Sequence, residues 1–396
     1  MTTVEPEPLI PAGYEIAYDQ FQLPIQAEKR IYKANGPALT TATSGDELTV
    51  SSSKVNFVFN KKSGLVTSYK VDGTEYFKDG FGIQPNFWRA PNDNDYGNGA
   101  PKRLQVWKQS SKNFHVTDVK MTTENKVVSL KATYLLAAGN LYVVTYRIYP
   151  SGIVNVSAQF TSTDMQAAET EVSEATRMAT FTPGSDAARK AASKLEVPRI
   201  GVRFRLPAQM NNVQYFGRGP EENYIDRNHG TLVGVYKTTA DKMYFNYVRP
   251  QENGHHTDTR WIALSPDKGN GLAIVADSLI GFNALRNSIE DFDSEEALPH
   301  PYQWNNFSPE EVANHDEKAA RNVLRRMHHV NDITPRDFVE VCVDMKQQGV
   351  GGYDSWGARP EPFHQIPANR DYSWGFTLVP VRSASQANEV AKYDYQ

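Results

Sequence analysis

The segment 142–160 reads YVVTYRIYPSGIVNVSAQF, and its pattern decides the fold class. Apolar or aromatic residues stand at every second position up to Ile148, and the alternation resumes after Pro150-Ser151-Gly152. A period of two places successive side chains on opposite faces of a strand, and Pro and Gly favour tight turns. The segment therefore predicts two antiparallel strands joined by a short turn.

The same alternation recurs along the chain and extends this prediction to the whole protein. It is found in the segments 54–60, 200–207, 338–345 and 373–379, with turn residues at 63–64, 72–73 and 267–271. Helix signals are scarce: a capping box in SPEE (308–311) and an Ala/Lys-rich run at 184–197. Many short strands favour an all-β fold made of large stacked antiparallel sheets rather than a small barrel.

Composition narrows the class of protein and of partner. The chain has 396 residues, 39% of them hydrophobic and 22% charged, as is typical of globular proteins. A net charge of −4 gives no basic field, so we expect no nucleic-acid partner, and no apolar run approaches the length of a membrane span. The single cysteine, Cys342, excludes an intrachain disulfide and is expected to be buried. The N-terminus lacks the pattern of a signal peptide, and the sequence indicates no compartment.

The sequence predicts that the chain divides into two parts of very different length. A stretch of small residues, KANGPALTTATSGDE (33–47), separates two strand patterns and predicts a linker. We therefore expect a short N-terminal piece, residues 1–45, and one large domain, residues 46–396. The polar region 162–198 is expected to be an insertion on the surface of that domain.

Four stretches carry more polar and backbone-fixing residues than strands need, and we expect the first of them, 88–99, to be a turn or a loop held in a fixed shape. They are WRAPNDNDYGNG (88–99), YFGRGPEENYIDR (215–227), YVRPQENGHHTDTRW (247–261) and GVGGYDSW (349–356). Each combines Gly or Pro with Arg, Asn, Asp, Glu or aromatic side chains. Paired donors and acceptors beside flat apolar surfaces are what a sugar requires, so these stretches favour a carbohydrate ligand.

Other chemistries fit these stretches less well. The NDND run lacks the spacing of a calcium loop, the adjacent histidines lack a third zinc ligand, and GRGPEE lacks the lysine of a phosphate loop. We therefore expect no metal or cofactor in this chain. A catalytic carboxylate pair could be drawn by residue type alone from Glu221, Glu222, Asp226, Glu252 and Asp258, but no spacing singles one out.

In their order, RAPNDNDYG, FGRGPEENYIDR, PQENG and GVGGYDSW resemble the C-terminal region of the β-galactosidases of glycoside hydrolase family 2. IPAGYEIAYDQFQLP (10–24) is similar to the last strand of the immunoglobulin-like domain that precedes this region, so the resemblance covers nearly the whole chain. It implies a large antiparallel β-supersandwich, the fold of galactose mutarotases.

The resemblance also implies what lies outside the chain. The family carries its catalytic glutamates on an N-terminal (β/α)₈ barrel, and no alternating strand-helix pattern of that kind occurs here. The intact enzyme would hydrolyse terminal β-D-galactosides with retention, whereas this chain alone would be inactive. Its partners would be the galactoside or galactose and the barrel-bearing part, with no membrane partner. A homo-oligomer is compatible with this scheme, and magnesium and a monovalent cation would be held largely by the barrel.

The resemblance assigns the substrate-facing residues. Trp356 would form an apolar wall for the galactoside, with Asp354 beside it, although Tyr353 replaces the first Asp of the family's GGDDSW. The active-site rim would carry Arg89, Asp93, Asn94 and Asp95.

A further set of polar residues allows two interpretations, a sugar-sized pocket or a structural network that holds the long loops. The set comprises Arg218, Glu222, Asn223, Asp226, Arg227, Gln251, Glu252, Asn253, His255 and Arg260. Two other functions stay open at this point. One is a stand-alone galactose-binding module, and the other is an aldose epimerase with Glu252 and His255 or His256 as acid and base.

Overall fold

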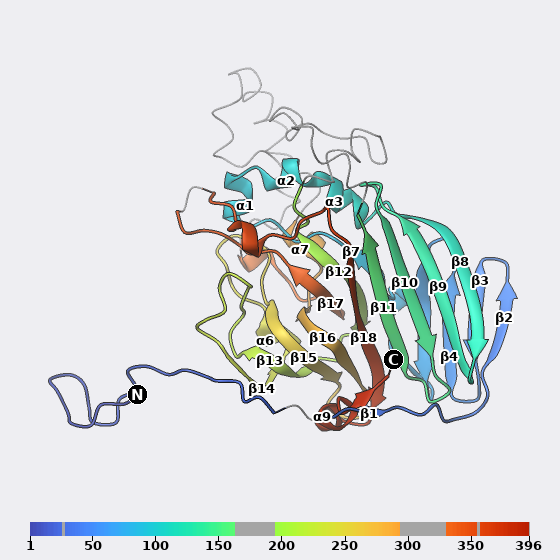
Figure 1. The fold of residues 1–396 in the computed structure, drawn as a ribbon, viewed down its shortest axis with the longest axis horizontal. Coiled ribbons are helices and arrows are strands. Elements are labelled where there is room, and N and C mark those ends of the chain that lie inside the picture. Colours follow the sequence, from blue (N-terminus) through green and yellow to red (C-terminus); the bar gives the residue numbers. More distant parts are fainter. Residues whose placement is uncertain (26–27, 163–194, 294–329, 355–356, 396) are drawn as a thin grey trace, which may run out of the picture.

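The protein is an all-β molecule built from two packed antiparallel sheets (Figure 1). The computed structural model describes residues 1–25, 28–162, 195–293, 330–354 and 357–395. Within these residues the strands form a five-stranded sheet, a twelve-stranded sheet and one short parallel pair. The predicted fold class, a large antiparallel β-supersandwich, is confirmed.

The smaller sheet follows the chain in order. Its strands are β2 (Thr40–Ser44), β3 (Glu47–Ser51), β4 (Val55–Asn60), β5 (Leu65–Val71) and β6 (Thr74–Glu75). In β4 the alternate residues Val55, Phe57 and Phe59 are buried, as the period of two predicts. Strand β2 lies inside the segment expected to be a linker and pairs with β3 across the predicted boundary at residue 45.

The larger sheet contains the segment 142–160 as a hairpin, as predicted. Strand β10 (Leu141–Ile148) pairs antiparallel with β11 (Val154–Thr161), and Tyr142, Val144, Tyr146 and Ile148 are buried. The other strands of this sheet are β7 (Gln84–Asn86), β8 (His115–Glu124), β9 (Val127–Leu135), β12 (Arg199–Pro207), β13 (Asn212–Gly219), β14 (Leu232–Thr239), β15 (His256–Ser265), β16 (Gly271–Leu285), β17 (Phe338–Gln347) and β18 (Tyr372–Val381).

The larger sheet branches at its longest strand, β16. The first half of β16 pairs with β18, which leads to β11, β10, β9 and β8. The second half pairs with β17, which leads to β12 and β7. Because of this branch, β12 and β17 are buried almost throughout rather than on alternate residues. Charged side chains on both strands therefore lie inside the protein.

Helices are short, and the first three lie together at one end of the molecule (Figure 1). They are α1 (Asp93–Gly97), α2 (Ala100–Arg103) and α3 (Gln105–Ser110); elsewhere lie α6 (Ala240–Met243), α7 (Ile289–Phe292) and α9 (Ala387–Val390). The expectation of a turn or loop over 88–99 is wrong for residues 93–97, which form α1. Asn92 accepts a hydrogen bond from the Asp95 amide and starts α1, so the Asn/Asp run caps a helix.

One hydrophobic core joins the two sheets, and a second, smaller one lies under the C-terminal segment. The main core includes Phe57 of β4, Tyr146 of β10 and Phe204 of β12. The smaller core includes Trp261 of β15 and Ala387 and Tyr395 of the C-terminal segment. Beside it, β1 (Arg30–Ile31) pairs in parallel with β19 (Tyr393–Asp394). Residues 1–25 are exposed almost throughout, and residues 10–24 form no strand beyond isolated bridges.

Several predictions fall on residues outside the described part of the chain: the helix start at 308–311, most of the 162–198 insertion, and Trp356. The last residues of that insertion are described, and the expectation of a surface position is wrong for them. Residues 195–198 are buried, and Glu196 is 6% exposed because it pairs with two arginines.

Candidate functional site

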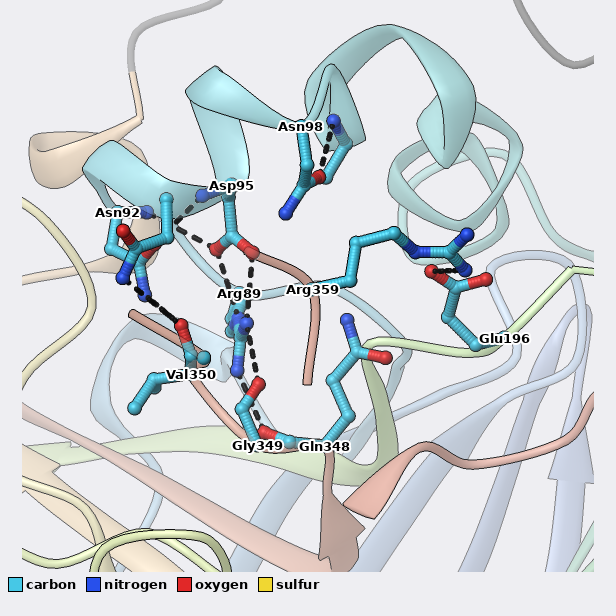
Figure 2. Close-up of polar contacts among 12 residues, drawn as sticks. Arg89, Asn92, Asp95, Asn98, Glu196, Gln348, Gly349, Val350 and Arg359 are labelled. Atoms are coloured by element: carbon cyan, nitrogen blue, oxygen red, sulfur yellow. Dashed lines mark hydrogen bonds and ion pairs between the residues drawn. The ribbon is translucent and has the colours of Figure 1, made fainter. Parts of the chain in front are cut away.

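The buried side chain of Arg89 joins helix α1 to the loop that follows β17. Arg89 is 2% exposed and donates to both carboxylate oxygens of Asp95, at 3.2 and 2.9 Å. It also donates to the carbonyl oxygens of Gln348 (2.7 Å) and Gly349 (3.0 Å), as Figure 2 shows. Burial opposes the guanidinium charge, but Asp95 outweighs it and raises the pKa of Arg89. The fork geometry of arginine thus fixes one helix and one loop in a single arrangement.

The Asp95 carboxylate binds a backbone amide in addition to the Arg89 side chain. Its carboxylate accepts from the Asn92 amide at 3.2 Å, which completes a capping box. Beside it, the Asn94 side chain donates to the carbonyl oxygen of Val350 at 3.3 Å. Of the predicted rim residues, Arg89 and Asn94 therefore hold the 348–350 backbone directly, and Asp95 holds Arg89 in place.

The same backbone is held from the other side by Asp226. Its two carboxylate oxygens accept from the amides of Val350 (3.0 Å) and Gly351 (2.8 Å). Gly351 and Gly352 have φ of +64° and +98°, a region that side chains with a Cβ rarely adopt. A Cβ at Gly352 would also lie 2.4 Å from the side-chain nitrogen of Asn94, so the Asn94 side chain would have to shift to accommodate it.

A second anchor fixes the residues that follow 356. Glu196 accepts from Arg103 of α2 and from Arg359, the latter at 2.9 Å. Burial favours the neutral acid, but the two guanidinium groups prevail and lower the pKa of Glu196. Asp354, which lies on the surface, accepts from the Ala358 amide at 3.0 Å. The residues on both sides of 355–356 are thus held in place, Asp354 by the Ala358 amide and Arg359 by Glu196.

The remaining rim residue, Asp93, lies on the surface of α1. Arg249 donates to its carboxylate at 2.7 Å and lies 3.9 Å from the centre of the Tyr96 ring. This contact joins the third motif, 247–261, to the first. Among the predicted substrate-binding residues with described positions, only Asp93 and Asp354 are mainly exposed.

Residues of the second and third motifs contact one another rather than an open pocket. Glu222 accepts from the Gly254 amide (2.7 Å), from Arg227 (2.8 Å) and from the Tyr247 hydroxyl. The side-chain oxygen of Asn223, which is fully buried, accepts from the amide and hydroxyl of Thr257.

Three other members of this set are paired as well. Arg218 contacts Asp258 and the Thr231 carbonyl, and Arg260 donates to the Asp258 carbonyl. Asn253 accepts from the Phe245 amide and donates to the Gln251 carbonyl, both within one loop. These contacts support the interpretation of a structural network that holds the long loops.

A buried charged cluster lies behind this network, and two of its members, Arg199 and Asp344, were not singled out by the sequence. Arg199 of β12 is fully buried and lies 2.9 Å from the Glu252 carboxylate and 3.2 Å from that of Asp344 on β17. Burial raises the pKa of Asp344 to about 7 against the attraction of Arg199, and Glu252 adds to the rise. Two carboxyl groups thus share one buried cation. Arg199 and Asp344 stand at alternate positions of strand patterns, which sequence reasoning reads as solvent-facing.

Strand glycines provide the room for this cluster. A Cβ at Gly201 of β12 would lie 2.2 Å from an Asp344 carboxylate oxygen, and one at Gly281 of β16 would lie 2.6 Å from the His255 ring. Burial and the nearby Arg199 lower the pKa of His255 well below its usual range. The adjoining cavity beside Glu252 and Asn283 holds about 10 Å³, which is too small for a sugar.

The described residues offer neither a metal-binding cluster nor a membrane-spanning helix. They contain no group of three or more His, Cys, Asp or Glu that could hold a metal ion. In the same part of the chain, no helix is long and apolar enough to cross a membrane.

Comparison with known proteins gives these motifs a family. A family model described as beta galactosidase small chain matches residues 51–378. The chain belongs to this family. The beta-galactosidase of Priestia megaterium is 33% identical over 373 residues, which cover 93% of this chain and 30% of that protein. The beta-galactosidase of Streptococcus thermophilus is 25% identical, with coverages of 94% and 30%. This small-chain family member therefore spans about 30% of the length of both relatives.

Solved structures similar to this family member include a galactose 1-epimerase from Lactobacillus acidophilus. That similarity has a TM-score of 0.39 and 8% sequence identity, and it covers 86% of this chain and 97% of the epimerase.

Proposed function

We propose that this chain is the C-terminal part of a β-galactosidase of glycoside hydrolase family 2 that hydrolyses terminal β-D-galactosides with retention. In this proposal the catalytic glutamates lie on a barrel outside the chain, and this part supplies wall residues of the active site and an assembly surface. The family match over residues 51–378 and the 33% identity to a beta-galactosidase support it.

The structural observation that carries the proposal is the double attachment of residues 348–351. Arg89 and Asn94 hold their carbonyl oxygens, and Asp226 holds their amides. A loop that completes the wall of a site on another domain must keep its shape without support from its own sheet. In the proposal, Asp93, Asp354 and Trp356 face the galactoside from this platform, while Arg89, Asn94 and Asp95 position it.

The alternative of an aldose epimerase is disfavoured by burial. An epimerase needs an acid and a base within hydrogen-bond reach of the sugar. Glu252, His255 and His256 are 4%, 1% and 3% exposed, and the cavity beside Glu252 holds about 10 Å³.

Hydrolysis of nitrophenyl β-galactoside by the purified chain tests the proposal directly. We expect no turnover above the no-enzyme rate. We also expect activity once the chain is fused, in place of the matching 30%, to the remainder of the Priestia megaterium enzyme. Turnover by the chain alone that survives repurification would contradict the proposal, and Glu222 and Glu252 would then be the first carboxylates to mutate.

A further inference from the structure

One unexplained feature lies at the opposite end of the molecule from α1, α2 and α3, where β1 and α9 lie (Figure 1). A pocket of about 390 Å³ opens there between the turns of both sheets and the C-terminal segment. Its wall combines residues from both sheets and the C-terminal segment, among them Lys54 just before β4, Asn270 just before β16 and Tyr393 of β19. This volume falls in the range of small-molecule sites.

Packed tyrosine rings form one side of the pocket. Tyr32 and Tyr393 line it and are half-buried. The Tyr32 ring lies 5.1 Å from the Tyr395 ring and 5.4 Å from that of Tyr149, between centroids. The Tyr395 hydroxyl donates to the Val390 carbonyl at 2.8 Å, and the Tyr149 hydroxyl donates to the Tyr395 carbonyl at 2.6 Å. These bonds hold Tyr395 and Tyr149, the two rings against which Tyr32 packs.

The polar side offers both donors and acceptors. Asn270 uses its amide nitrogen on the Thr74 hydroxyl, and Gln386 uses its amide oxygen on the Arg382 amide. The Asn270 oxygen, an acceptor, and the Gln386 nitrogen, a donor, have no hydrogen-bond partner among the described residues. Lys54 and Asp72 pair with each other at 3.4 Å.

These observations indicate the class of ligand. A charged ligand is bound by several converging groups of opposite charge. The pocket lining has two cations, Lys54 and Arg382, and Lys54 is already paired with Asp72, so a charged ligand is disfavoured. A neutral polyhydroxylated ligand instead uses single donors and acceptors beside aromatic rings. We propose that this pocket binds a neutral saccharide of one or two rings, at a site remote from the galactoside rim. The proposal stands independently of the proposed function, because it uses no residue of that rim.

Saturation-transfer NMR with lactose and the purified chain tests the proposal. We expect saturable binding that Asn270→Ala and Gln386→Ala each weaken at least about fivefold, and that Tyr393→Ala abolishes. Both amide side chains are partly or fully exposed, so the first two variants are expected to fold normally, as far-UV circular dichroism would check.

Gln159→Ala, an exposed amide on β11 that belongs to neither the pocket nor the rim, is the matched control and should leave lactose binding unchanged. Two outcomes would overturn the proposal: no saturable binding of lactose, galactose or glucose, or binding that Arg249→Ala at the rim removes and the pocket variants retain. Neither outcome affects the hydrolysis test of the proposed function, which concerns the other end of the molecule.

Discussion

Asp344 stands at a strand position that its sequence pattern predicts to face solvent, yet its side chain is fully buried. Its folded pKa of about 7 exceeds its ordinary value of 3.8, so the folded state binds a proton that the unfolded state releases between these pH values. Its contribution to stability is complete below pH 4 and is lost as the pH rises to 7. We expect the difference in unfolding free energy between wild type and Asp344→Asn to change by ~1.4 kcal/mol per pH unit in this interval.

Urea unfolding at pH 5, 6, 7 and 8 would measure this difference. Glu252 shares Arg199 with Asp344, so the comparison reports this coupled pair, whereas the distant carboxyls titrate equally in both proteins. Glu290, whose pKa is lowered to about 2 mainly by Arg203, offers a control with the opposite sign. A pH-independent difference would show that Asp344 stays ionised. The sequence offered no signal for this behaviour, since Arg199 and Asp344 look solvent-facing until the branch in the sheet buries both sides of their strands.

At the scale of elements, one carboxylate, that of Asp226, accepts from the backbone amides of the loop 348–351. Asp226 accepts from two amides, and Asp226→Asn leaves one acceptor oxygen for these two donors. We expect a loss of about 1–3 kcal/mol in local stability and faster hydrogen exchange at Val350 and Gly351. Hydrogen exchange read by mass spectrometry would measure it, with Asp118→Asn on the exposed face of β8 as control. Unchanged exchange in Asp226→Asn would contradict this role.

The elements differ in how well their sequences predict them. The strands of the hairpin 142–160 follow from the alternation of side chains, because both strands bury one face. The segment 88–99 was misread because Asn and Asp favour turns and helix starts alike; the spacing of Asn92 and Asp95 is that of a capping box, which could have revealed α1. The attachment of 348–351 to Arg89 could not be predicted, since its partners lie more than 250 residues apart.

At the scale of the whole molecule, the two ends of the chain should differ in their effect on stability. Residues 1–17 are exposed almost throughout, and their hydrogen bonds are internal to that segment. The first described contacts with the body come from Tyr18 to the Gly230 carbonyl and from Gln20 to the Val233 backbone. By contrast, the C-terminal segment buries Ala387 and Tyr395 against Trp261 of the large sheet.

Removal of residues 1–17 should therefore change the free energy of unfolding by less than ~0.5 kcal/mol, because it uncovers no core. Removal of residues 384–396 should cost at least about 3 kcal/mol, since it exposes the smaller core and leaves Trp261 facing water. Urea unfolding followed by tryptophan fluorescence compares the two truncations in one assay. Equal losses would mean that the N-terminal segment packs against the body in solution. If the C-terminal truncation keeps full stability, the smaller core does not support the large sheet.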